Sequence, residues 1–152
     1  MKNISAYEST IWSSLIVTVA ASIYFFGKVF GAIAAGSPLA PGDVARMGLA
    51  VIVILVAVEV ALALAFAAWC KGEPQTDERD ELIAAKSARN AYYILITGLF
   101  ILIGNLGVQA LIGKGPWLTM DTGTTVVMLV FALVGAEVSH YLSRIVYYRV
   151  GA

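Results

Sequence analysis

Long apolar runs divide the chain into four segments, at about residues 11–35, 44–69, 91–112 and 122–147. Each run has at least the roughly 20 residues that an α-helix needs to cross the hydrocarbon core of a bilayer. None alternates apolar and polar residues with a period of two, as the strands of a membrane barrel do. The pattern therefore predicts an all-α integral membrane four-helix bundle that forms a single transmembrane domain over residues 1–152.

The breaks between the runs support this division. Pro38 and Pro41 separate the first two runs, and Gly113 and Pro116 separate the last two. The first run is too long for the hydrophobic part of a cleaved signal peptide, and only Lys2 carries positive charge before it. We therefore expect the first run to be retained as a true span.

Composition narrows the function classes. The chain of 152 residues is 60% hydrophobic and 13% charged with no net charge, whereas soluble domains carry about 25% charged residues. Zero net charge gives no basic field for direct nucleic-acid binding. A single cysteine, Cys70, and a single histidine, His140, exclude an intrachain disulfide, a CxxC pair and bis-histidine haem ligation. We expect no enzyme activity, and the sequence indicates no particular cofactor.

The distribution of basic residues predicts the orientation. Three of them fall on one side of the predicted membrane (Lys28, Arg46 and Lys114) and seven on the other (Lys2, Lys71, Arg79, Lys86, Arg89, Arg144 and Arg149). Basic residues accumulate on the cytoplasmic side. We therefore expect a multi-pass protein of the inner (cytoplasmic) membrane, with both termini and the 71–90 loop in the cytoplasm.

The 71–90 loop is the most polar part of the chain. Thr76 or Asp77 can cap a helix whose first turn is rich in acids, and no helix breaker follows before the third span. The pattern predicts one continuous helix that starts near Asp77, projects from the membrane and runs into the third span.

The charges of this helix have no opposite charge three or four residues away, where an intrahelical pair would form. We expect them to find partners on other elements, such as Arg144, Arg149 or Lys71, or on another protein. The alternative is a solvated acidic turn that only caps the helix. The candidate partner-binding residues are Asp77, Glu78, Arg79, Asp80, Glu81, Lys86 and Arg89.

The segment DERDELIAAKSARNAYYIL resembles the signature of an uncharacterised prokaryotic family of small four-span membrane proteins. The shared pattern is Asp-Glu-Arg-Asp, an apolar pair, Lys-Ser or Lys-Ala, and an aromatic entry to the third span. Here these residues are Asp77, Glu78, Arg79, Asp80, Leu82, Ile83, Lys86, Ser87, Tyr92 and Tyr93. Members of the family are often encoded beside helix-turn-helix regulators. The resemblance therefore implies a membrane-side partner for a cytoplasmic DNA-binding regulator.

Polar residues inside the spans are costly in lipid and are functional candidates by default. Glu59 and Glu137 each lie about ten residues, or about 15 Å, from the inner boundary, so their carboxylates should be level. Together with His140, Tyr141 and Arg144 they form a predicted intramembrane polar cluster. Because the stripe on the fourth span continues only toward the cytoplasm, we expect any site to open there and the outer half to be plain scaffold.

Glu137 and His140 have the Glu-x-x-His spacing of helical metal ligands. With Glu59 they are candidate metal ligands, but one chain lacks a full set, and a hydrogen-bonded structural cluster is the alternative. Small residues at spacing four, such as Gly27 and Gly31, favour close helix packing, either within one bundle or in a homodimer.

These features predict a membrane-embedded regulatory or signalling protein that docks a cytoplasmic partner through the charged 77–89 helix. The alternative is a small oligomeric ion, proton or metal transporter that uses Glu59, Glu137 and His140.

Overall fold

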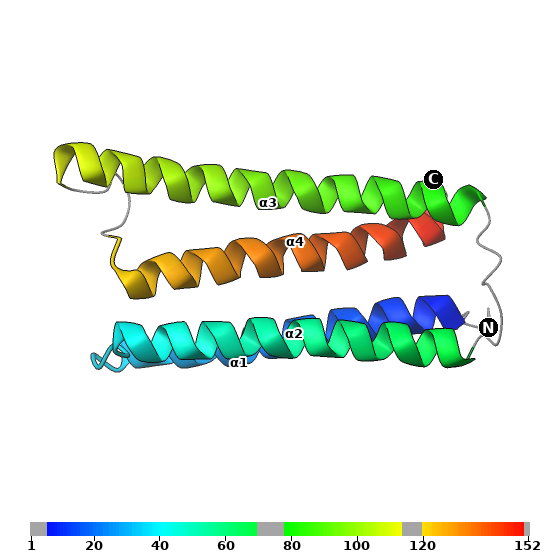
Figure 1. Ribbon diagram of the computed structural model, residues 1–152, viewed down its shortest axis with the longest axis horizontal. Coiled ribbons are helices and arrows are strands. Elements are labelled where there is room, and N and C mark those ends of the chain that lie inside the picture. The colour runs from blue at the N-terminus through cyan, green and yellow to red at the C-terminus, as the bar shows by residue number, and fades with distance from the viewer. Residues whose placement is uncertain (1–5, 70–77, 114–119, 151–152) are drawn as a thin grey trace.

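The computed structural model describes residues 6–69, 78–113 and 120–150, and these form four helices without a strand. The helices are α1 (Ala6–Ala34), α2 (Pro41–Trp69), α3 (Glu78–Ile112) and α4 (Thr122–Val150) (Figure 1). All four are long and apolar enough to cross a membrane, so the chain is a multi-pass membrane protein. The 35 residues of α3 span about 52 Å, well beyond a hydrocarbon core of about 30 Å.

These helices confirm the predicted four-helix membrane fold and the extension of the third helix. Asp77, the predicted start of that extension, lies outside the described residues. We call the end of the bundle where α1 begins and α4 ends the terminal end, and the opposite end the far end. The starts of α2 and α4 both lie at the far end (Figure 1).

Local sequence determines where the helices start and stop at the far end. Gly36 has a φ of 71°, and the amides of Gly36 and Ser37 donate back to Ile33 and Ala32, which closes α1. α2 begins at Pro41, three residues before the predicted start of the second span. Proline is favoured at the first helical position because its missing N–H would have no partner there.

Helix α4 is the centre of the arrangement. α1, α2 and α3 each pack against α4, and within the described residues α3 packs against no other helix (Figure 1). One core cluster in the far half joins α1, α2 and α4 and contains Phe25, Val29, Val44, Val51, Val130 and Val134. A second cluster at the terminal end joins α1 and α4 through Ile11, Leu15, Tyr141 and Ile145.

Two glycines allow the backbones to approach α4 closely. A Cβ atom placed on Gly48 of α2 would lie 2.7 Å from Cγ1 of Val126. A Cβ atom placed on Gly98 of α3 would lie 2.7 Å from Cβ of Ala132. Helices in lipid associate through such close packing, because the hydrophobic effect gives them no net driving force.

The small-residue seams read from the sequence are not the seams used within the chain. A Cβ atom on Gly27 or Gly31 of α1, or on Gly104 or Gly107 of α3, would meet nothing within 4 Å. The outer surface around them is strongly apolar; Phe100, for example, is 69% exposed. These faces are therefore available to lipid or to another chain.

We predict that Gly98→Ala weakens the contact between α3 and α4, because the new methyl group overlaps Ala132. Overpacking of this kind costs about 1–3 kcal/mol. The matched control is Gly104→Ala on the same helix, which should leave stability unchanged or slightly higher. Denaturant unfolding in detergent micelles, followed by circular dichroism, measures both. Equal effects of the two variants would contradict the proposed seam.

Candidate functional site

The charged start of α3 lies against the last turns of α4. The Tyr148 hydroxyl donates to Oδ1 of Asp80 at 2.8 Å, and Nη2 of Arg79 approaches the Tyr148 carbonyl oxygen at 3.5 Å. The second contact places a cation at the C-terminal end of α4, where helix carbonyls lack intrahelical partners and the helix dipole is negative. One residue of α4 thus engages both an acid and a base of α3.

Further contacts extend this interface toward the membrane. Nδ2 of Asn90 donates to Oγ of Ser143 and to the hydroxyl oxygen of Tyr147, both at 3.1 Å. Nζ of Lys86 lies 5.9 Å from the centre of the Tyr147 ring. Ile83 and Ser87 are fully buried in the same interface. These contacts hold the start of α3 against α4 over several turns. We call the side of α3 that makes them its braced face.

The expectation that the charges find partners on another element fits these contacts, but the groups differ from those expected. Arg79 and Asp80 both engage Tyr148, a residue that lies on α4 with Arg144 and Arg149. Lys71 lies outside the described residues. Sequence spacing alone did not single out Tyr148, because its hydroxyl becomes a partner only once α3 and α4 lie side by side.

The opposite face of the same segment is open. Glu78, Glu81 and Arg89 are exposed, and Leu82 is 48% exposed. Ala85 and Ala88 lie between the charged residues on this face and are also exposed within the part of the chain that the structure describes. The segment from Glu78 to Arg89 thus has a braced face toward α4 and an accessible face of mixed charge.

The intramembrane polar residues form a second group. Glu59 of α2, Ser14 of α1 and Tyr141 of α4 line a cavity of about 100 Å³, together with Thr10, Ile11, Leu62, Ala63 and Arg144. The Tyr141 hydroxyl interacts with both Glu59 and Ser14, and with Glu137 one turn earlier on α4. Tyr141 therefore links the two carboxylates that the sequence placed at the same depth.

His140 faces a different neighbour. Its imidazole interacts with the backbone at Ser87 of α3, and it also lies within electrostatic range of Arg144 and Glu59, which line the cavity. His140 therefore connects the polar residues of the cavity with α3. Among the described residues, no group of three or more His, Cys, Asp or Glu side chains is placed to hold a metal ion.

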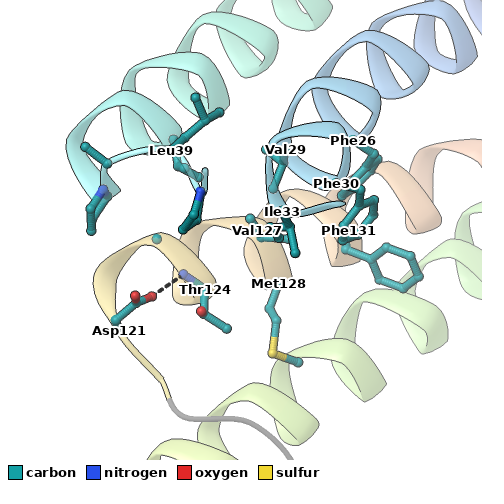
Figure 2. A pocket seen from close by; sticks show the side chains of 15 residues that line it. Phe26, Val29, Phe30, Ile33, Leu39, Asp121, Thr124, Val127, Met128 and Phe131 are labelled. Carbon is teal, nitrogen blue, oxygen red and sulfur yellow. Dashed lines mark hydrogen bonds between the residues drawn. The ribbon is translucent and has the colours of Figure 1, made fainter. Parts of the chain in front are cut away.

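A second cavity lies at the far end, where the sequence indicated plain scaffold. Its volume is about 660 Å³ (Figure 2). Its wall is mostly apolar and comes from α1, the α1–α2 connection and the starts of α2 and α4. The wall includes Phe26, Phe30, Ile33, Asp121, Met128 and Phe131. We call this cavity the far-end groove.

Sequence reasoning missed the far-end groove because it searched the spans for polar residues. The groove contains almost none, and its aromatic residues look like ordinary lipid-facing side chains. The usable signal was Asp121, an acid directly before the fourth span, followed by Thr124 three residues later. Oδ1 of Asp121 accepts a hydrogen bond from the Thr124 N–H at 2.6 Å, which caps α4 (Figure 2).

This helix cap favours the ionised form of Asp121, which lies at the mouth of the groove. The backbone N–H of Thr124, and then its hydroxyl, stabilise the ionised carboxylate, so the pKa of Asp121 lies below its usual value. A lowered pKa in the folded state adds stability above the pKa of the unfolded chain. That stability is lost as the pH falls through the folded-state pKa.

We predict that Asp121→Asn keeps the cap and is nearly neutral at pH 7, whereas Asp121→Ala costs about 1 kcal/mol. The stability difference between wild type and Asp121→Ala should shrink as the pH falls below about 4, because the wild-type carboxylate then becomes protonated. Thermal unfolding in detergent between pH 7 and pH 2 measures this. A difference that stays constant with pH would contradict the capping role.

Comparison with known proteins adds no assignment to these sites. Searches with protein-family models, among curated proteins and among solved structures each found no match to this chain.

Proposed function

We propose that the chain is a membrane-anchored docking protein whose terminal end faces the cytoplasm and presents the exposed face of the Glu78–Arg89 segment to a regulatory protein. The observation that carries the proposal is the bracing of this segment by α4 through Tyr148, Tyr147 and Ser143. A helix held on one face by several contacts presents its other face in one orientation. Such preorganisation lowers the entropic cost of binding.

The charge pattern indicates the chemistry of the partner. Glu78 and Glu81 are exposed near the tip of the segment, and Leu82 adds an apolar contact between them and the membrane. A basic surface with an apolar patch complements this face. DNA-binding regulators carry basic surfaces, and the resemblance of the DERDE segment also implies a regulator as partner. Rim charges of this kind mainly steer association and set specificity.

A second candidate function is ion or proton transport. The observation that favours it is the cavity beside Glu59, in which a carboxylate, a phenol and two hydroxyls from three helices face one another. Intramembrane carboxylates mark proton and ion pathways in many transporters. A chain of four spans would serve this role as an oligomer.

To test docking, we predict that the double reversal Glu78→Lys with Glu81→Lys lowers the affinity for the cytoplasmic partner at least tenfold. The partner is first captured from native membranes with the wild-type chain, identified by mass spectrometry and purified. Binding is then measured pairwise against detergent-solubilised chain at two salt concentrations. The matched control is Asp43→Lys at the far end, which also reverses an exposed acid and should bind like wild type.

The unfolding midpoint separates docking from folding. Glu78 and Glu81 lie outside the braced face, so their reversal removes only a favourable interaction with the dipole of α3, about 0.3–1 kcal/mol each, and should leave the chain folded. Wild-type affinity in a stably folded double reversal would overturn the docking proposal. Equal losses in the double reversal and in Asp43→Lys would also count against it, because they would indicate a general charge effect.

To test transport, we predict that Glu59→Gln removes any pH-dependent cation or proton flux in proteoliposomes, because it replaces the titratable group by a neutral one of the same shape. Flux is followed with a pH-sensitive dye trapped in the vesicles. Asp43→Asn outside the cavity serves as the control. Absence of flux in the wild type, or unchanged flux in Glu59→Gln, would reject this second function.

A further inference from the structure

The far-end groove is a cavity between α1, α2 and α4 at one end of the membrane-crossing helices. Its 660 Å³ fall within the range of about 300–1,000 Å³ typical of small-molecule sites. Membrane helices gain stability by close packing, so an apolar group that fills a hollow of this size gains van der Waals contacts that the empty groove lacks. The groove therefore raises the question of what occupies it.

The wall of the groove indicates an apolar body for the occupant. The ring of Phe26 lies 5.8 Å from that of Phe30 and 5.9 Å from that of Phe131, measured between centroids, so the three rings form one aromatic surface. Ile33 on α1 and Met128 on α4 continue this surface (Figure 2). Because Phe30, Ile33 and Phe131 are each more than half exposed, the groove is accessible from the side.

The mouth of the groove indicates a positive head group. Asp121 lies at one end of the groove, and within the described residues its carboxylate meets only neutral donors of its own helix. The other acid at the far end, Asp43, lies 3.5 Å from Arg46 and does not line the groove. Among the described residues that line the groove, Asp121 alone carries a formal charge, while the rest of the wall is almost entirely apolar.

We propose that the far-end groove binds a free amphipathic cation of drug-like size, with its apolar body against Phe30 and Phe131 and its ammonium group beside Asp121. The ammonium group pairs with the exposed carboxylate of Asp121, whose ionised form is stabilised by the Thr124 N–H. An anionic head group with the same tail meets repulsion at the same place. This site is independent of the proposed docking function, which uses the terminal end.

The test uses the full chain in phosphatidylcholine nanodiscs, with ¹³C-labelled methionine methyl groups. Met128 lines the groove and Met47 does not, so their resonances report on binding and on general perturbation respectively. Three probes with the same tail are titrated below the concentration that dissolves the discs: dodecyltrimethylammonium, dodecanol and dodecyl sulfate. We expect a saturable shift of the Met128 methyl with the cation, and at least tenfold weaker binding of the other two.

Two variants locate the site. Asp121→Asn keeps the helix cap and should weaken binding of the cation about tenfold, whereas Asp43→Asn should not change it. Ile33→Trp fills the groove from an exposed position and should abolish the Met128 shift. Its control is Ile23→Trp, an exposed position on the same helix outside the groove. If Ile33→Trp fails to fold, the comparison of Asp121→Asn with Asp43→Asn decides alone.

Three results would overturn the proposal. One is the lack of a saturable Met128 shift with the cation. Another is equal affinity for all three head groups, or wild-type affinity in Asp121→Asn, since either would show that charge plays no part. The last is a Met128 shift that follows only the lipid composition or the protein concentration, which would assign the groove to a bilayer lipid or to a second copy of the chain.

Discussion

The packing of α4 against each of the other three helices is the constraint on which the structure depends. In lipid, close approach of backbones has to replace the hydrophobic driving force that assembles soluble bundles. Gly48 brings α2 to Val126, and Gly98 brings α3 to Ala132, both on α4. The core cluster of the far half, the polar cavity around Glu59, the bracing of α3 and the far-end groove all use side chains of α4.

Much of the fold could be predicted from the sequence, because span length and apolar runs are local properties. The continuation of the third helix into the charged segment also followed from a local signal, namely the lack of any breaker after residue 77. Packing was not predictable in the same way. Gly27 and Gly31 had the spacing of four that favours close packing, but the close contacts form at Gly48 and Gly98. Which face of a uniformly apolar helix meets a neighbour depends on the neighbour's shape, which no single segment encodes.

The candidate sites show the same difference between features that the local sequence predicts and features that depend on packing. Glu59, Glu137 and Tyr141 stood out because polar residues are rare within spans, and the structure brings them together. His140 stood out in the same way, but its contact with the backbone at Ser87 of α3 depends on how α3 packs against α4, which is a tertiary property. The apolar wall of the far-end groove gave no signal, since apolar residues that line a hollow and apolar residues that face lipid have the same composition; only Asp121 at its mouth marked the place.

The restriction of α3 to a single neighbour has a consequence for biosynthesis. Spans enter the membrane in chain order, so α1 and α2 can pair as soon as both are inserted. α3 has no described contact with either, so it lacks a packing partner until α4 is inserted. During that interval the side chains of Asn90 and Gln109 lack the partners that they later find at Ser143, Tyr147 and Met120. The last helix to be synthesised therefore completes the assembly, and a chain truncated before residue 122 would leave α3 without its described neighbour.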